Sequence, residues 1–235
     1  MISVLLPVYN EADILDESIK KLHAYLEREK LPHEIIVTSN GSTDETNIIG
    51  HELMKKYSWF RFFSLPERGV GRAFVISAKN AHGDALVCLD IDLPSDLAFI
   101  LYAKDLLKYV DMVIGSKFMG RQYRSAIRIL GSQLYVVIAQ WLFGISLSDF
   151  SPDSKAFKRE AILPALEKLD GWTGYVFELA LYLSAKNKRI VQISIDCKDR
   201  RKSKFNLLHE AFYRYFHLYR CWREFRNAKS WFHCT

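Results

Sequence analysis

The feature that most restricts the fold of this chain is the alternation of short apolar runs with amphipathic stretches through its first half. Each apolar run is four or five residues long and is typical of a buried strand, whereas the stretches between them have helical spacing. The expected strands are residues 2–6, 34–37, 61–65, 86–89 and 111–115, and the expected helices are residues 10–29, 45–57, 69–82 and 96–109. Strands and helices that alternate at this spacing favour an α/β fold with a mostly parallel sheet.

The second half of the chain follows a less regular pattern. A polar and basic stretch at 117–128 precedes an apolar segment, and a loop at 149–153 precedes a short strand. The elements expected there are helices at 134–143, 160–168 and 175–186 and strands at 155–157 and 190–195. From Lys198 onward the chain is basic and aromatic.

Composition limits the class of protein. The 235 residues are 49% hydrophobic and 26% charged, which is enough apolar material for one large globular domain, alone or with an appendage. A net charge of +6 favours anionic partners, and nucleic acid, a phosphorylated substrate and an anionic membrane surface all qualify. The first residues read as a strand and not as a signal peptide, and no apolar stretch reaches the length that spans a bilayer.

Cysteine and histidine spacing gives no sign of a metal site. The seven histidines lack the HxH and HExxH patterns, so we expect them on the surface. The four cysteines are scattered, which is typical of reduced thiols in a cytoplasmic protein: Cys88, Cys197, Cys221 and Cys234.

Two carboxylates follow the fourth expected strand. The apolar run that begins at Val87 ends in Asp90 and Asp92, and Pro94 then breaks the strand. Because residues i and i+2 of a strand point to the same side, both carboxylates are expected to converge just past the strand end. They would repel each other without a cation between them, and oxygen-only ligation favours Mg²⁺ or Mn²⁺. The alternative is a solvated, Asp-rich turn.

The topology places this acid pair near two other loops. In parallel α/β sheets, ligands bind beyond the carboxyl ends of the strands. The loops that begin at Pro7, Thr38 and Asp90 are therefore expected to share one crevice.

Taken together, the loops resemble family 2 glycosyltransferases of the GT-A fold, in particular the polyprenyl-phosphate hexose synthases of the dolichol-phosphate mannose or glucose synthase type. Segments that match in order along the chain are Leu6–Glu11 (LPxYNE in the family), Asn40–Thr46 (DDGSTDxT), Gly69–Ala73 (GxGxA), His82–Asp84, Gly115–Lys117, Asp149 with Lys155–Arg159, and Arg200 with Ser203–Lys204. A lone Asp-x-Asp is weak evidence, whereas this ordered set covers almost the whole chain.

The resemblance implies a division of the chain and a set of site residues. Residues 1–197 would form the catalytic domain, with a nucleotide-binding half (1–115) and an acceptor half (116–197), and 198–235 a basic, aromatic helical segment. The nucleoside would lie against Pro7, Tyr9, Glu11, Ser39, Asn40 and Asp90, with Ile91 as the floor. Catalytic roles would fall to Asp90, Asp92, Lys117 and Arg128, with Asp92 coordinating the metal most directly and Asp90 lying nearer the ribose. Phosphate and acceptor contacts would come from Lys117, Arg128, Ser132, Arg200, Ser203 and Lys204.

Two departures from the family pattern affect the donor. Ser39 and Asn40 stand where the family has paired acids, so the usual carboxylate contact to the nucleobase is missing. An amide both donates and accepts, so a base can still be recognised, but either GDP- or UDP-hexose fits. Pro94 stands where mannose-synthase-like members often carry Gln, which leaves glucose or another hexose open.

The implied reaction is metal-dependent, inverting transfer of a hexose from a nucleoside diphosphate to a polyprenyl phosphate at the cytoplasmic face of a membrane. A phosphate acceptor with a second pKa near 6 is already largely dianionic at about pH 7 and needs little help from a base. A sugar hydroxyl acceptor would need a carboxylate base, and Glu178 and Asp149 are the candidates, although a structural role for Glu178 is the alternative.

The C-terminal segment has the make-up of an interfacial amphipathic helix. Aromatic and apolar residues recur at three- and four-residue spacing, with arginines between them: Phe205, Leu208, Phe212, Tyr215, Phe216, Tyr219 and Trp222, and Arg214, Arg220, Arg223 and Arg226. The alternative is a helix packed on its own domain or on a second subunit, as in a homodimer. The apolar segment 134–143 poses the same choice, and we interpret it as interfacial, beside the acceptor site.

Three rival hypotheses remain open on sequence alone. The first is a family 2 enzyme whose acceptor is a saccharide hydroxyl. The second is a basic nucleic-acid-binding protein, whose affinity would depend steeply on salt, although we expect no nucleic-acid partner. The third is a relative that binds nucleotide sugar without transferring it, given Ser39 and Asn40.

Overall fold

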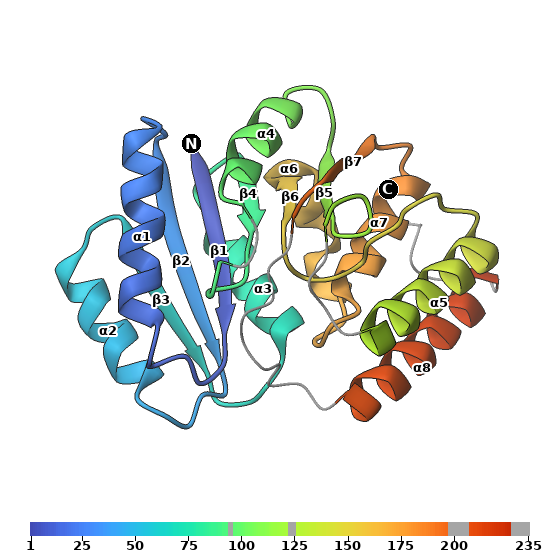
Figure 1. The fold of residues 1–235 in the computed structure, drawn as a ribbon, viewed down its shortest axis with the longest axis horizontal. Coiled ribbons are helices and arrows are strands. Elements are labelled where there is room, and N and C mark those ends of the chain that lie inside the picture. Colours follow the sequence, from blue (N-terminus) through green and yellow to red (C-terminus); the bar gives the residue numbers. More distant parts are fainter. Residues whose placement is uncertain (94–95, 122–125, 197–206, 227–235) are drawn as a thin grey trace.

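A seven-stranded sheet forms the centre of the computed structural model, which describes residues 1–93, 96–121, 126–196 and 207–226 (Figure 1). The strand order is β3-β2-β1-β4-β6-β5-β7. The strands are β1 (Ile2–Val8), β2 (His33–Asn40), β3 (Phe60–Leu65), β4 (Ala85–Cys88), β5 (Met112–Ser116), β6 (Lys155–Lys158) and β7 (Ile190–Ser194). β1 to β4 pair in parallel and β7 is parallel to β5, but β6 lies antiparallel between β4 and β5. The predicted mostly parallel α/β sheet is confirmed.

Helices cover both faces of this sheet (Figure 1). They are α1 (Leu15–Arg28), α2 (Thr46–Lys56), α3 (Val70–Asn80), α4 (Ala98–Leu106), α5 (Ala126–Phe143), α6 (Arg159–Ile162), the 3₁₀ helix η1 (Leu163–Lys168), α7 (Tyr175–Ala185) and α8 (Leu207–Arg226). No helix in the described ranges combines the length and the apolarity needed to cross a membrane.

Each face of the sheet has its own apolar core. One core joins buried residues of α3, α5 and α7 and includes Leu218 and Cys221 of α8. The other joins β1 and β2 to α1 and α4 through side chains such as Ile19 and Phe99. Because α8 contributes buried side chains to the first core, the described part of the C-terminal segment packs on the domain.

The N-terminal boundaries differ from the sequence prediction for local reasons. β1 continues through Pro7 to Val8, although we predicted that the strand would end before the proline. The ladder between β1 and β4 ends at Leu5, so Pro7 interrupts no pairing on that side. The first helix begins at Leu15 instead of residue 10, because Asn10 has a left-handed backbone (φ 54°) and belongs to a turn.

Two boundaries in the second half also differ. α5 begins at Ala126, eight residues before the apolar segment that predicted it. The helix predicted for 160–168 is divided into α6 and the tighter η1, with Pro164 at the start of η1. A proline lacks the N–H that an α-helix would use there, so the division follows from the sequence.

Candidate active site

The carboxyl ends of β1, β2 and β4 lie at the same edge of the sheet, the lower edge in Figure 1. Val8 pairs with Ser39, and the N–H of Leu89 donates to Leu5 O at 3.1 Å. The chain therefore leaves three neighbouring strands at Tyr9, at Asn40 and at the acid pair. The three predicted loops therefore lie at one edge of the sheet, and the crevice that they are expected to share stays a prediction.

The acid pair lies in a turn and not on a strand. β4 ends at Cys88, the N–H of Leu93 donates to Asp90 O at 3.1 Å, and Leu93 has φ 47°. The prediction that strand alternation would align Asp90 and Asp92 was therefore wrong, because the backbone is no longer extended there. Ile91 is buried in the core between the two half-buried acids and fixes the turn.

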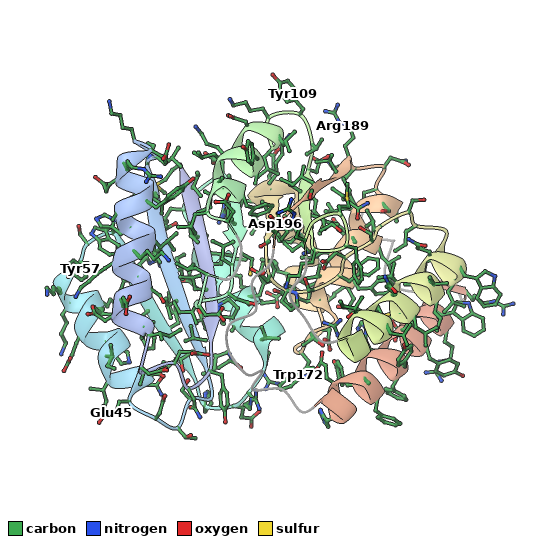
Figure 2. All side chains as sticks on the ribbon, in the orientation of Figure 1. Glu45, Tyr57, Tyr109, Trp172, Arg189 and Asp196 are labelled. Atoms are coloured by element: carbon green, nitrogen blue, oxygen red, sulfur yellow. The ribbon has the colours of Figure 1, made fainter. Side chains whose placement is uncertain are left out.

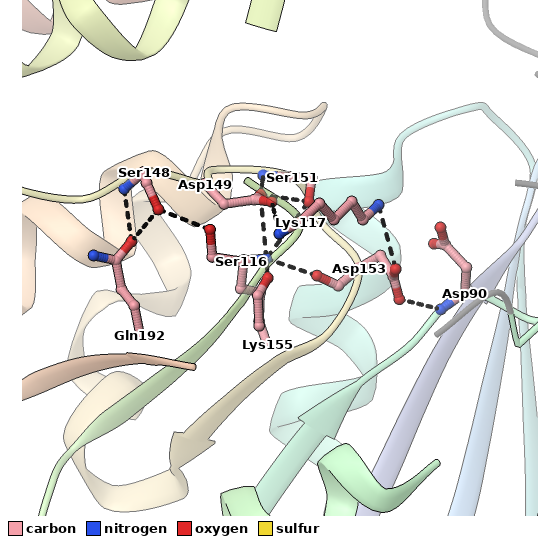
Figure 3. Close-up of polar contacts among 10 residues, drawn as sticks. Asp90, Ser116, Lys117, Ser148, Asp149, Ser151, Asp153, Lys155 and Gln192 are labelled. Atoms are coloured by element: carbon pink, nitrogen blue, oxygen red, sulfur yellow. Dashed lines mark hydrogen bonds and ion pairs between the residues drawn. The ribbon is translucent and has the colours of Figure 1, made fainter. Parts of the chain in front are cut away.

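Asp90 lies beside a buried carboxylate from a distant part of the chain (Figure 3). Its N–H donates to Asp153 Oδ1 at 3.2 Å, and Asp153 Oδ2 lies 3.3 Å from Lys117 Nζ. Burial and the negative charge of Asp153 raise the pKa of Asp90 to about 8, although Lys117 opposes the shift. Asp92 adds to the repulsion, so oxygen ligands and excess negative charge meet at one place. That donor set fits Mg²⁺ or Mn²⁺.

A buried lysine fixes the loop that carries Asp153. Lys155 is fully buried, and its Nζ donates to Asp153 O at 2.7 Å and to Gly115 O at 3.2 Å and lies 3.4 Å from Asp149 Oδ1. Burial lowers the pKa of Lys155, and the Asp149 carboxylate opposes this shift. Lys155 therefore links the end of β5 to the start of β6.

Asp149 completes this network. Its Oδ1 accepts hydrogen bonds from Ser151, and its Oδ2 accepts the N–H of Lys117 at 3.0 Å. Burial alone would raise the pKa of Asp149, but Lys155, Lys117 and Ser151 outweigh it and hold this pKa at about 2. The carboxylate thereby positions the backbone of Lys117, whose ammonium lies near Asp153 and the acid turn (Figure 3).

Asn40, which stands where the family has an acid, forms hydrogen bonds with two backbone groups of the protein. Its Nδ2 donates to Val8 O at 2.7 Å, and its Oδ1 accepts the N–H of Gly69 at 3.3 Å. The neighbouring Ser39 is buried and donates to Ser42 Oγ at 2.8 Å. An amide can both donate and accept, as these two backbone partners require, whereas an ionised carboxylate only accepts. The departure from the family pattern therefore has a structural reason.

An aromatic and cationic stack lies beside this loop. The Arg68 guanidinium lies 3.8 Å from the centroid of the Tyr9 ring and 5.4 Å from that of Trp172. Figure 2 shows Trp172 at the same lower edge, where its indole N–H donates to Glu210 of α8 at 2.9 Å. Sequence reasoning missed Arg68, since an arginine before a Gly-Val-Gly segment carries no distinctive spacing.

The other predicted site residues fall into two groups. Pro7, Glu11 and Ser132 are half-buried, the first two at the edge that carries the acid turn and Ser132 in α5. The backbone of Arg128 lies in α5, but its side chain is outside the described part. Arg200, Ser203 and Lys204 lie wholly outside the described residues, so their roles stay predictions.

Neither candidate for the catalytic base is positioned to act as a base, because each is bonded within the protein. Asp149 is committed to the network above, and Glu178 is buried between α7 and α8, where its Oε1 lies 2.9 Å from His217 Nε2. The structural role that we considered for Glu178 fits this placement. The expectation of surface histidines was wrong for His217, which is 2% exposed, because the aromatic face of α8 also packs on the core.

Comparison with known proteins identifies the family of this chain. A family model described as Glycosyl transferase family 2 matches residues 3–162. The chain belongs to this family. The expected GT-A-like fold is confirmed.

The individual curated relatives have low sequence identity to this chain. Glycosyltransferase AglD of Haloferax volcanii is 26% identical over 222 residues, which are 89% of this chain and 35% of the relative. Dolichol-phosphate mannosyltransferase of Pyrococcus furiosus is 31% identical over 119 residues, 50% of this chain and 33% of the relative. The chain thus spans about a third of the length of these curated relatives.

Among solved structures, glucosyl-3-phosphoglycerate synthase of Mycobacterium tuberculosis, in complex with Mn²⁺, UDP-glucose and phosphoglyceric acid, has a TM-score of 0.69. The match is 21% identical and covers 94% of this chain and 79% of the synthase. At this identity the likeness supports the fold alone.

Proposed function

We propose that this glycosyltransferase moves a hexose from a nucleoside diphosphate to a polyprenyl phosphate, with a divalent cation held by Asp90 and Asp92. The observation that carries the proposal is the acid turn after β4, which lies beside the loops that follow β1 and β2. Asp90 lies there beside the additional carboxylate of Asp153, and Asp92 adds its negative charge to Asp90. The structural neighbour was solved with Mn²⁺ and UDP-glucose, and we propose a donor of the same class, a nucleoside diphosphate hexose, for this chain.

The residues at this edge would have different roles in the transfer. When bound, Mg²⁺ or Mn²⁺ would neutralise the charge that builds on the leaving diphosphate. Lys117 would add a positive charge beside it, since its ammonium is held 3.3 Å from Asp153. Tyr9, Ser39 and Asn40 would border the nucleoside, and the Arg68 guanidinium stacked on Tyr9 would stiffen that side.

The acceptor is proposed from the contacts of the two candidate bases and from the name of a relative. A phosphate acceptor is its own nucleophile, and the two candidate bases are already bonded within the protein. The Pyrococcus furiosus relative is named for dolichol phosphate. These observations favour a lipid phosphate over a saccharide hydroxyl.

Helices α5 and α8 supply a surface on which such a lipid could be reached. The two helices lie side by side (Figure 1), and each exposes large apolar side chains at three- and four-residue spacing. These side chains are Leu130, Leu134, Val137 and Trp141 of α5 and Phe212, Phe216 and Tyr219 of α8. Trp141 is 82% exposed. On a membrane, the exposed Arg223 of α8 and the half-buried Arg220 would be available to anionic headgroups. We therefore propose that the protein binds peripherally to a membrane, at the cytoplasmic face that the resemblance implies.

The donor and the metal are tested together by thermal shift. GDP-, UDP- and dTDP-hexoses are screened with and without Mn²⁺, and one of them is expected to raise Tm only when the metal is present. Asp92→Ala should lose this stabilisation and turnover, whereas Asp105→Ala, an exposed acid of α4, should keep both. Stabilisation that ignores the metal or survives Asp92→Ala would contradict the proposal.

The lipid acceptor is tested by changing α5. The double variant Leu134→Ser/Trp141→Ser is expected to sediment less with anionic vesicles and to turn over a long-chain polyprenyl phosphate in those vesicles more slowly. Its turnover of a short, water-soluble prenyl phosphate should stay at the wild-type level. Ile48→Ser is the matched control, since Ile48 is an exposed apolar residue of α2. Turnover of sugar acceptors and not of either prenyl phosphate would favour the saccharide alternative.

A further inference from the structure

A second group of ligand-type side chains lies between α7 and α8, among apolar residues of the first core. Glu178 comes from α7, and His217 and Cys221 come from α8, where they are one helical turn apart and share a face. Their exposed fractions are 3%, 2% and 8%. None of the three enters the proposed transfer reaction.

The ligand atoms of the three side chains converge. His217 Nε2 lies 2.9 Å from Glu178 Oε1, and Cys221 Sγ lies 3.6 Å from His217 Nε2 and 3.9 Å from Glu178 Oε1. Tetrahedral zinc, with bonds of about 2.3 Å to sulfur and about 2.0 Å to nitrogen or oxygen, would separate these atoms by ~3.3 Å (N to O) and ~3.6 Å (N or O to S). Cys221 Sγ also lies 3.9 Å from His217 Nδ1, so the thiol would have to rotate from the side of the ring toward the Nε2 lone pair to share one ion with the other two groups.

We propose that Glu178, His217 and Cys221 bind a structural Zn²⁺ ion that fastens α8 to α7. Thiolate, imidazole and carboxylate are common zinc ligands. Structural zinc sites usually have four protein ligands, so with three side chains this ion would need a water molecule as its fourth ligand. Binding replaces the S–H bond of Cys221 by a Zn–S bond and releases the proton to solvent. The ion with one thiolate and one carboxylate is then electrically neutral, which suits a buried position.

Neighbouring groups hold the side chains of Glu178 and His217 in place. Glu178 Oε2 accepts the N–H of Asp170, and Asp170 Oδ2 in turn accepts the N–H of Gly174 at 2.8 Å. Gly174 packs directly on the imidazole, since a Cβ there would lie 2.4 Å from His217 Cε1. The ring of Tyr213 stacks on the imidazole, with the centroids 6.1 Å apart. Partners of this kind hold ligands in place in zinc proteins.

A zinc ion at this site would have to replace the direct hydrogen bond between His217 and Glu178. Without metal, His217 and Glu178 satisfy each other, and Arg220 lies 3.7 Å from Glu178 Oε1. Burial, and then the Glu178 carboxylate, raise the pKa of the Cys221 thiol, so metal-free sulfur keeps its proton. In the metal-free state the Cys221 thiol makes only long contacts with this pair, donating to Glu178 Oε1 at 3.9 Å, whereas around zinc all three groups would be ligands.

Cobalt substitution tests the site, because Co²⁺ bound to a thiolate has a near-ultraviolet charge-transfer band. Protein produced with zinc is expected to carry the metal after purification, and the cobalt form is expected to show the band. Cys221→Ala and His217→Ala should each lose the bound zinc and the band. Cys88→Ala, which changes another buried cysteine, should keep both. Removing zinc with a chelator should lower the Tm of the wild type by about 5–10 °C and leave that of Cys221→Ala unchanged.

The spectroscopic signal separates this site from the proposed catalytic metal. Asp92→Ala should keep the cobalt–thiolate band while it loses turnover. His33→Ala should also keep the band, although His33 lies near His23 and Glu27 in another cluster of ligand-type residues. Absence of the band in wild-type protein, or a band that survives Cys221→Ala, would overturn the zinc assignment and leave the transfer reaction untouched.

Discussion

Restoring the family's acid at position 40 is expected to destabilise this protein. The Asn40 amide lies between an acceptor, Val8 O at 2.7 Å from Nδ2, and a donor, the N–H of Gly69 at 3.3 Å from Oδ1. In Asn40→Asp the oxygen that replaces Nδ2 would face the Val8 carbonyl oxygen. The hydrogen bond would become a repulsive contact in a site that is only 5% exposed.

The magnitude follows from what is left unsatisfied. A buried carbonyl without its donor costs about 1–3 kcal/mol, and burial of the new carboxylate adds to this. The stronger bond from Gly69 to a charged acceptor offsets part of the cost. We therefore expect a loss of about 2–4 kcal/mol in the free energy of unfolding at pH 7, which corresponds to a fall in Tm of about 5–12 °C.

The pH dependence distinguishes this cause from a general loss of packing. A protonated carboxyl could donate to Val8 O, so folding raises the pKa of the new group above its unfolded value of about 3.9. The loss of stability should therefore be small below about pH 4 and should grow as the pH rises through the folded-state pKa.

Urea unfolding of wild type and variant from pH 3.5 to pH 8 measures this difference. Gln133→Glu is the control, because Gln133 is exposed within α5 and the same change from amide to carboxylate there is expected to cost less than about 0.5 kcal/mol. Equal stability of Asn40→Asp and wild type at pH 7 would refute the reasoning. A loss that does not change with pH would refute the hydrogen-bond explanation.

The buried charges elsewhere give three further expectations. Lys155→Met removes from the buried Asp149 the cation with the larger effect and leaves only Lys117, so it should lower the free energy of unfolding by about 3–5 kcal/mol in urea. Asp149→Asn/Lys155→Met should recover part of this loss. Because the pKa of Asp149 is held at about 2, its stabilisation is present above about pH 4 and disappears as the pH falls toward 2, so the double variant should lose less stability in acid. Ser3→Ala removes a hydroxyl that donates to Glu34 Oε1 at 2.6 Å and accepts from Gly83 at 2.9 Å, and should cost about 1–3 kcal/mol by thermal unfolding.

Each expectation has an outcome that contradicts it. Equal stability of Lys155→Met and wild type would mean that Asp149 finds another partner or becomes protonated. Parallel acid profiles of wild type and double variant would mean that Asp149 does not titrate as stated. Ser64→Ala, at an exposed serine of β3, is the control for Ser3→Ala, and equal effects of the two changes would contradict the buried role of Ser3.

The local sequence pattern was sufficient to predict most of the fold. The predicted strands at 34–37, 61–65 and 111–115 all fall within observed strands or one residue from their ends, because apolar runs between turn residues leave little choice. The start of α1 was missed because Asn10, a good helix-entry residue by composition, is held in a left-handed turn. That turn depends on Thr43, whose N–H donates to Asn10 Oδ1 at 2.7 Å from a different loop.

The ion pairs of the site depend on contacts that local pattern does not contain. Asp153 lies 63 positions from Asp90 in the sequence, and nothing in the loop 149–153 marks it as the neighbour of the acid turn. Likewise, His217 and Cys221 have the spacing of a helical ligand pair, but their meaning depends on Glu178 from another helix. Such sites become visible only once the sheet order and the helix packing are known.

The orientation of β6 explains why those neighbours arrive at the acid turn. An antiparallel strand begins at the edge where its parallel neighbours end. Lys155, the first residue of β6, pairs with Cys88 at the end of β4 and with Ile114 near the end of β5. The residues just before Lys155 must therefore lie beyond the carboxyl end of β4, which is where Asp90 begins its turn. A parallel β6 would send the same loop to the opposite edge, so the antiparallel insertion is what brings Asp153 to Asp90.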